Sequence, residues 1–434
     1  MKTSSKRLLF LALASAIFTV AQAISAEQRL TSPDSKLAII VSDTDGLHYR
    51  VEVDGKPVVA DSQLGLEFQD GTKLGTAAVI TQTETASHDG VWENRFGQRG
   101  IVPDRWKERR LTLTEKAAKP RIFGLIVRAY DNGVAFRYDL PQVSGLGNFV
   151  LTRELTEFRF AGDYRCWFGE ESPCAENQYP EGKLSKIPAV TSSKKRAGQP
   201  FLSVLPLLVE APGCYVAVAE SDLLDWAGLF LTGTGTPSVS ASLATREDRN
   251  GLVASSVPRV SPWRVLMIGR QAGDLVNSDL IATLATPNKL GDVSWVKPGI
   301  CAWDSWWTGV NPGLPQFTGI DARGDTASHK DYIDLAAEMG WPYQLVDWFW
   351  YKDDPTKPLP HVDLPEVFAH AKKRGVRLFV WMDSKDLRKV GLEKTFSAIS
   401  AWRAAGVKVD FMDSDSQEPC VGMPMHWRLL RSTS

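Results

Sequence analysis

The sequence predicts a protein of two domains, an antiparallel β-sandwich followed by an incomplete (β/α)8 barrel. From about residue 30 to 290, short strand patterns and turn dipeptides succeed one another without a long amphipathic helix. After about residue 298, strand and helix patterns alternate. The 434 residues are enough for more than one domain. With 43% hydrophobic residues and a net charge of −1, the composition argues against a disordered chain and a dedicated nucleic-acid binder.

The N-terminus has the pattern of an export signal over residues 1–26. Three basic residues precede an apolar run from Leu8 to Ala21, and small residues at Ala23 and Ala26 offer cleavage sites. The run is short for a membrane span, which needs roughly 20 apolar residues. We therefore expect a secreted or periplasmic protein without a stable membrane span.

The sandwich is expected over residues 27–297. Its clearest signal is a hairpin with strands at Phe123–Tyr130 and Val134–Tyr138, joined by a turn at Asp131-Asn132-Gly133. Another strand, Leu47–Val53, ends at the turn dipeptide Asp54-Gly55. Repeated short strands of this kind favour a large antiparallel sandwich.

The second domain is expected to begin at Pro298. Predicted strands start at residues 300, 343, 376 and 407, at intervals of 43, 33 and 31 residues that are typical of βα units. Helical spacing lies between them, over residues 327–339, from Asp363 as N-cap to Gly375, and over 392–405 with Gly406 as C-cap. An open doubly wound sheet is the alternative. We favour the barrel because no glycine-rich phosphate loop follows any of these strands.

Aspartates fall at or near the C-terminal end of each predicted barrel strand, where barrel enzymes carry their active sites. Tryptophans gather at the same strand ends, and indole faces beside carboxylates suit sugar rings. The alternative is that these tryptophans are core residues and some aspartates are helix N-caps. The aspartates are Asp304, Asp347, Asp383, Asp410 and Asp413.

Cleavage of a glycosidic bond typically needs two carboxyl groups, an acid and either a nucleophile or a base. Asp410, in Lys-Val-Asp-Phe, is the best candidate for a nucleophile. Asp413 is the reserve, and an N-cap role is equally open for it. We expect Asp347 to contact a sugar hydroxyl and Trp306 to form a stacking platform. Asp304, Asp383 and Asp413 complete the substrate-binding candidates.

Several motifs in order resemble glycoside hydrolase family 97, over about Leu30 to Glu418. They are Leu64-Gly-Leu-Glu-Phe68, Ser261-Pro-Trp-Arg-Val-Leu-Met-Ile-Gly269, Trp295-Val-Lys-Pro-Gly299 with Ala302-Trp-Asp-Ser-Trp-Trp307, and Gly406-Val-Lys-Val-Asp-Phe-Met-Asp413. The resemblance implies a β-super-sandwich before a catalytic (β/α)8 barrel. It also implies the retaining, α-galactosidase-like branch, because Asp410 matches the aspartate nucleophile that the inverting α-glucosidases of the family lack.

The resemblance further implies a calcium ion beside the substrate, with one glutamate ligand from the sandwich. Glu176 resembles that position, and calcium prefers several carboxylate and carbonyl oxygens. Glu170 and Glu171 are nearby alternatives, and an ordinary surface role for Glu176 is also open.

The C-terminal part is expected to depart from the family. Residues 298–418 would form the first half of a barrel and 419–434 an aberrant tail, since a full barrel takes roughly 250 residues. The acid/base glutamate of the family would then not be present in this chain. Two functions follow: a hydrolase that removes a terminal α-linked sugar from an oligosaccharide or glycoside, or an inactive truncated or sugar-binding protein. An α-glucosidase specificity stays open, as does the oligomeric state.

Overall fold

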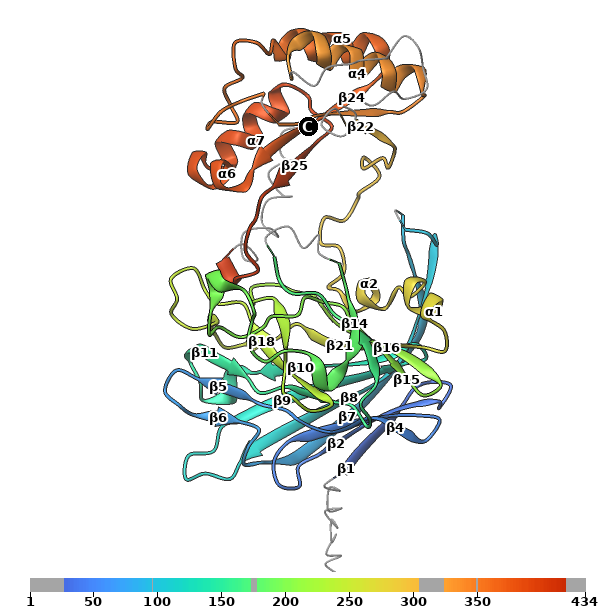
Figure 1. Ribbon diagram of the computed structural model, residues 1–434, viewed down its shortest axis with the longest axis vertical. Helices are drawn as coiled ribbons and strands as arrows, with labels where there is room; N and C mark the ends of the chain where they lie inside the picture. The colour runs from blue at the N-terminus through green and yellow to red at the C-terminus, as the bar shows by residue number, and fades with distance from the viewer. Residues whose placement is uncertain (1–26, 96, 173–177, 304–323, 349, 419–434) are drawn as a thin grey trace, which may run out of the picture.

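The computed structural model describes residues 27–418, apart from residues 96, 173–177, 304–323 and 349. Figure 1 shows two bodies, a β-rich body coloured blue to yellow and an α/β body coloured orange to red. This arrangement confirms the predicted order of a β domain followed by an α/β domain. Within the described ranges, no helix combines the length and the apolar character needed to cross a membrane.

The β-rich body is built around a sheet of ten strands, in the order β14-β13-β15-β16-β21-β10-β9-β8-β7 with β20 beside β10. Every pairing in this sheet is antiparallel. The strands are β7 (Ala78–Glu93), β8 (Ile101–Glu115), β9 (Ile122–Tyr130), β10 (Gly133–Leu140), β13 (Arg165–Trp167), β14 (Glu181–Lys183), β15 (Leu207–Ala211), β16 (Cys214–Ser221), β20 (Arg259–Val260) and β21 (Trp263–Gly269).

Three smaller antiparallel sheets complete the β-rich body, in the orders β1-β2-β3-β4, β19-β11-β5-β6 and β12-β18-β17. Their strands are β1 (Glu27–Thr31), β2 (Leu37–Ser42), β3 (His48–Val53), β4 (Lys56–Gln63), β5 (Leu66–Phe68), β6 (Lys73–Leu74), β11 (Asn148–Glu154), β12 (Glu157–Arg159), β17 (Leu229–Gly233), β18 (Ser238–Leu243) and β19 (Val253–Ser256). Short 3₁₀ turns lie at η1 (Gln142–Ser144), η2 (Leu184–Lys186) and η3 (Lys194–Arg196). The sheets enclose one continuous apolar core, which confirms the predicted antiparallel sandwich.

The predicted hairpin is present with one correction. Strands β9 and β10 pair with Tyr130 opposite Gly133, so the turn consists of Asp131 and Asn132 alone. Gly133 is the first residue of β10 and does not belong to the turn. The turn at Asp54-Gly55 joins β3 to β4 as expected, and both residues have the positive φ, 49° and 74°, that a two-residue hairpin turn with matching twist requires.

Two short helices that the sequence did not predict, α1 (Ala272–Val276) and α2 (Leu280–Leu284), cover part of the other face of the ten-stranded sheet. Leu280 and Leu284 pack there against Trp263 and Met267 of β21. The large sheet is therefore apolar on both faces in its middle.

An ionic cluster lies inside the sandwich where β21, β11 and β16 meet. Arg264 and Glu154 are both 0% exposed, and Arg264 donates from Nε to Glu154 Oε1 at 2.7 Å and from Nη1 to Glu220 Oε2 at 2.8 Å. Burial raises the pKa of Glu220, against the opposing effect of Arg264. A single buried guanidinium thus forms ion pairs with two carboxylates that come from different strands.

The α/β body contains a four-stranded sheet in chain order, β22-β23-β24-β25, and all its pairings are parallel. Helices connect successive strands, which is the arrangement of consecutive βα units. The elements are β22 (Cys301–Trp303), α4 (Thr326–Glu338), β23 (Tyr343–Val346), α5 (Leu364–Arg374), β24 (Arg377–Asp383), α6 (Ser384–Val390), α7 (Leu392–Ala401) and β25 (Gly406–Asp410).

The helix boundaries agree with the sequence at α5 and differ at α7. Asp363 caps α5 by accepting from Glu366 N at 3.0 Å, and Gly375 ends it with φ 75°. The predicted helix over 392–405 stops at Ala401, because Arg403 turns the chain with φ 59°. The prediction that Gly406 is a C-cap is wrong, since this glycine is the first residue of β25.

We predict that Arg264→Met lowers the free energy of unfolding by about 3–5 kcal/mol, because it leaves Glu154 and Glu220 as unpaired carboxylates inside the sandwich. Urea unfolding followed by circular dichroism measures the change. The matched control is Arg159→Met, which removes a surface ion pair to Glu157 and should change stability by less than about 1 kcal/mol. Equal effects of the two substitutions would contradict the prediction.

Candidate active site

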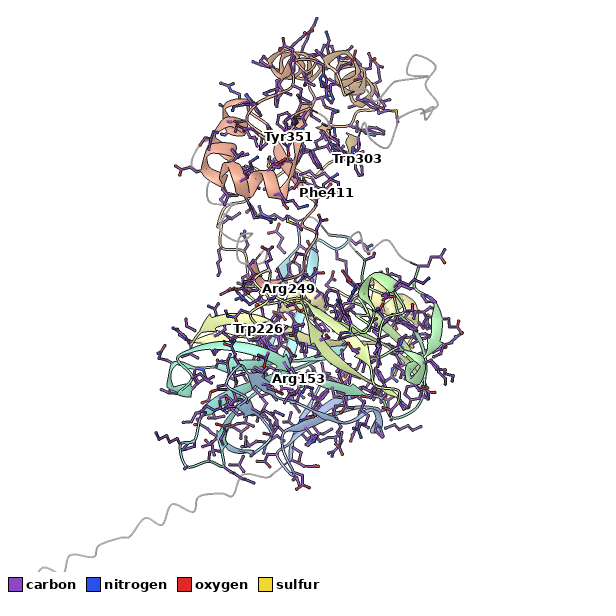
Figure 2. The ribbon with its side chains drawn as sticks, turned by 60° about the vertical axis from the view of Figure 1, so that its left-hand side comes forward. Arg153, Trp226, Arg249, Trp303, Tyr351 and Phe411 are labelled. Carbon is purple, nitrogen blue, oxygen red and sulfur yellow. The ribbon has the colours of Figure 1, made fainter. Side chains whose placement is uncertain are left out.

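The carboxyl ends of the parallel strands open onto a cleft of about 830 Å³ between the α/β body and the sandwich. In Figure 2, the labelled Trp303 and Phe411 lie on the side of the α/β body that faces the sandwich. The α/β body contributes Trp303, Asp347, Trp348, Trp381, Lys408, Asp410, Phe411, Met412, Asp413, Ser414 and Asp415. The sandwich contributes Glu171, Ser172, Arg196, Gln199, Leu202, Val204, Phe230, Ala244 and Thr245.

Asp410 is the last residue of β25, and three donors hold its carboxylate. Oδ2 accepts from Trp381 Nε1 at 2.9 Å and lies 3.1 Å from Lys408 Nζ, while Oδ1 accepts from the backbone N–H of Phe411 at 2.9 Å. The side chain is still 34% exposed. The carboxylate is therefore fixed in orientation and open to the cleft.

The environment of Asp410 favours its ionised form. Partial burial alone would raise the pKa of this carboxyl, but the hydrogen bonds from Trp381, Phe411 and Lys408 together lower it below its ordinary value. A carboxyl group that acts as a nucleophile must be ionised at working pH, so the site meets this requirement.

Lys408 connects Asp410 to a second carboxylate. Its Nζ lies 3.6 Å from Asp347 Oδ1 and 4.2 Å from the centre of the Trp303 ring. Asp347 is only 4% exposed, and its other oxygen accepts from Trp303 Nε1. One ammonium thus lies between two carboxylates, above an indole face, at the cleft wall.

Aromatic rings also gather around the carboxylate of Asp410. Trp381 stacks on Trp348 with ring centroids 6.1 Å apart, and Phe411 packs on the edges of both. Trp348 is 49% exposed, which leaves one of its faces available to the cleft. A partly exposed indole beside carboxylates is a suitable surface for the C–H face of a sugar ring.

Of the two remaining predicted aspartates that the structure describes, Asp413 lines the cleft and Asp383 does not. Asp383 ends β24 opposite Asp410, but its Oδ1 accepts from Lys385 N at 2.7 Å and caps α6, and it does not line the cleft. Asp413 lines the cleft and forms an ion pair with Lys385 at 3.1 Å. It lies four residues before the helical residues that start at Gln417, so the N-cap alternative for Asp413 is wrong.

Three predicted site residues, Asp304, Trp306 and Glu176, lie outside the described residues. Of the alternative glutamates, Glu171 lines the cleft and pairs with Arg196, and Glu170 bonds to Thr191. Among the described residues, no three acidic, histidine or cysteine side chains come together as metal ligands. Because Glu176 lies outside the described residues, the calcium site stays a prediction.

Residues 414–418 attach the α/β body to the sandwich. The side-chain amide of Gln417 donates to Asp225 Oδ1 at 2.9 Å and to Ala254 O at 3.0 Å. Its oxygen accepts from Arg246 Nη1 and from Ala254 N, both at 2.8 Å. This segment leads directly from β25 into the sandwich, so it fixes one end of the cleft.

Sequence reasoning named Glu171 only as an alternative calcium ligand and missed Arg196, which pairs with it at the cleft. No strand or helix pattern marks these loop residues, and their approach to Asp410 depends on tertiary structure. It also assigned no role to Lys408, although a signal existed: residues two apart on a strand face the same side, so Lys408 must accompany Asp410.

Comparisons with known proteins identify the family. A family model described as "Glycosyl-hydrolase 97 N-terminal" matches residues 30–287, and one described as "Glycoside hydrolase 97" matches residues 306–425. Two curated relatives are similar in sequence. A "Retaining alpha-galactosidase" from Bacteroides thetaiotaomicron is 27% identical over 95% of this chain, and a "Probable retaining alpha-galactosidase" from Streptomyces bingchenggensis is 29% identical over 96%.

The chain spans 64% and 63% of the length of these two relatives. Among solved structures, it is similar to a glycoside hydrolase family 97 enzyme from Pseudoalteromonas sp. strain K8, known in complexes with panose and with acarbose. Both complexes give a TM-score of 0.81 and 25% identity, over 94% of this chain and 65% of theirs. From its sandwich to its parallel strands, the chain belongs to glycoside hydrolase family 97.

Proposed function

We propose that the chain acts in the removal of a terminal α-linked galactose from a glycoside or oligosaccharide, with retention of configuration. The observation that carries this proposal is the carboxylate of Asp410, held ionised at the end of β25 and open to the cleft. Both curated relatives bear the name of a retaining α-galactosidase, which supports the same reaction.

In this reaction Asp410 attacks the anomeric carbon. One carboxylate oxygen forms a bond to that carbon while the bond to the leaving oxygen breaks, and the leaving oxygen takes up a proton from an acid. Water then replaces Asp410, so that two inversions restore the original configuration. The rigid end of a β-strand suits this role because it holds the carboxylate in attack geometry. None of the described residues is assigned as the acid.

The neighbours of Asp410 provide the contacts for the sugar. Lys408 and Asp347 offer a donor and an acceptor side by side, which suits two adjacent hydroxyl groups. Trp348 offers the exposed aromatic face. These groups bind and orient the sugar, so that its anomeric carbon lies over Asp410.

Three further parts of the proposal rest on the sequence and the family. The four βα units would belong to a (β/α)8 barrel, the protein would be exported by its N-terminal signal, and calcium would bind through Glu176 together with residues outside the described ranges. No step of the reaction is assigned to calcium.

An α-glucosidase specificity is the second candidate. The observation in its favour is that the solved family 97 enzyme similar to this chain is bound to panose and to acarbose, which contain glucose units. Comparison of α-galactosyl and α-glucosyl fluorides as substrates discriminates the two. A larger kcat/KM for the glucosyl compound would contradict the galactosidase proposal.

We predict that 5-fluoro-α-D-galactosyl fluoride labels Asp410 covalently. The fluoride leaves without a proton, so this reaction requires the nucleophile and not the acid, and the ring fluorine slows the hydrolysis of the product. Peptide mass spectrometry after digestion locates the attached sugar. Asp410→Ala should abolish the labelling.

Asp386→Asn is the control, because it removes a carboxylate of α6 that does not line the cleft, and it should be labelled like the unaltered chain. Labelling of Asp413 in place of Asp410 would mean that Asp413, the reserve candidate, is the nucleophile. If no aspartate carries the sugar, the proposed function is wrong.

We predict that Lys408→Met moves the acidic limb of the pH profile to higher pH. Asp410 reacts only when it is ionised, and its lowered pKa keeps it ionised into acid, so activity falls only as pH drops through that lowered pKa. Removal of the Lys408 cation, 3.1 Å from Asp410 Oδ2, destabilises the ionised carboxylate and so raises the pKa of Asp410. The kcat/KM for α-galactosyl fluoride, measured against pH, reports the shift, and an unmoved limb would contradict it.

A further inference from the structure

Trp381 reaches Asp410 from the neighbouring strand. The pairing of β24 with β25 places Trp381 opposite Lys408, and the indole Nε1 donates to Asp410 Oδ2 at 2.9 Å. Trp381 is buried, at 5% exposure, and its ring packs against Trp348 and Tyr351. Its contact with Asp410 is thus through the N–H group.

The indole of Trp381 is held on several sides. Trp348 stacks on it at 6.1 Å and Tyr351 lies against it at 6.0 Å, while Phe411 contacts it edge-on at 5.7 Å. Its own backbone carbonyl accepts from Trp350 Nε1 at 2.8 Å. A donor packed in this way cannot turn aside, so it imposes a direction on the carboxylate that accepts from it.

The two carboxylate oxygens of Asp410 have different hydrogen-bond donors. Oδ2 accepts from Trp381 Nε1–H and also lies 3.1 Å from the ammonium of Lys408. Oδ1 receives only the N–H of Phe411 among the described donors, and keeps one lone pair. Phe411 has φ 51°, a left-handed conformation that brings its N–H back onto the preceding carboxylate.

We infer that Trp381 is a positioning residue for the nucleophile, which anchors Oδ2 of Asp410 so that Oδ1 is the oxygen that attacks the anomeric carbon. This inference rests on the proposed function. In the step, Oδ1 forms the bond to carbon while the bond to the leaving group breaks, and the electron pair of that bond departs with the leaving group.

Charged groups approach Asp410 from each neighbouring element. Lys408 lies on its own strand, Asp347 follows β23, and Asp383 ends β24, while Lys385 pairs with Asp413 beyond the strand end. Glu171 and Arg196 line the cleft from the sandwich. Trp381 is an uncharged donor, so its replacement removes a hydrogen bond and leaves all these charges in place.

The test is Trp381→Phe in the full chain, with a readout that does not require catalysis. A water-soluble carbodiimide with glycine ethyl ester couples to protonated carboxyl groups, and peptide mass spectrometry measures the coupling at Asp410 over a series of pH values. We expect the midpoint at Asp410 to move to higher pH in the variant, since the ionised form loses a donor. Trp402→Phe, an indole of the same body outside the cleft, is the matched control and should leave the midpoint unchanged. An unchanged midpoint in Trp381→Phe overturns the inference.

Two further measurements complete the test. Labelling by 5-fluoro-α-D-galactosyl fluoride should slow roughly tenfold in Trp381→Phe, because a carboxylate that is no longer held in one direction is less often in attack geometry. If Trp381→Phe does not fold, the indole N–H signals of the unaltered chain are followed by NMR. One of them should titrate together with Asp410 and stop doing so in Asp410→Asn, and the absence of such a signal overturns the inference.

The outcomes separate this inference from the proposed function. A shifted midpoint without labelling of Asp410 by the fluoro sugar means that the hydrogen bond acts as inferred and the proposed reaction is wrong. Labelling at Asp410 with an equal rate and an equal midpoint in Trp381→Phe means that the reaction stands and Trp381 has no positioning role.

Discussion

The candidate site depends on the register in which β24 and β25 pair. Because residues two apart on a strand face the same side, Lys408 and Asp410 both reach the cleft, and the parallel pairing sets Trp381 beside Lys408. A slip of one residue would turn Asp410 away from the cleft and separate it from both donors. The donors that lower the pKa of Asp410 are thus placed by a backbone alignment, the register of β24 and β25.

The sandwich contributes a wall of the cleft as well as a support. Arg264 keeps β21, β11 and β16 together from within. Asp225, which follows β16, and Arg246, which follows β18, are the sandwich residues on which Gln417 docks. Arg196 and Glu171 face the cleft from the same body. Both domains therefore line the cleft at Asp410, and under the proposed function the sandwich would influence which leaving groups fit there.

Local signals predicted much of the fold. The capping of α5 by Asp363, the β9–β10 hairpin and the four strands of the parallel sheet each arise from residues close in sequence. The predicted end of the fourth strand also singled out Asp410 as a candidate, and the structure places it in the cleft. Gly406 was misread because a glycine after a helical pattern serves equally as a cap or as the start of a strand. The contact between Trp381 and Asp410 depends on the pairing of strands that are distant in sequence, which no local pattern encodes. The cap by Asp383 is local, because it accepts from Lys385 N two residues on, but an aspartate between a strand and a helix serves equally as a cap or as a site residue.

The docking of Gln417 has a consequence for how the two domains can change over time. Its amide uses two donors and two acceptors on the sandwich, and only six residues separate it from Asp410. We expect a substitution at Asp225 or Arg246 to displace the segment that follows Asp410, although neither residue lines the cleft. Natural selection on the chemistry of one domain therefore extends to surface residues of the other, and the two domains must diverge as a pair.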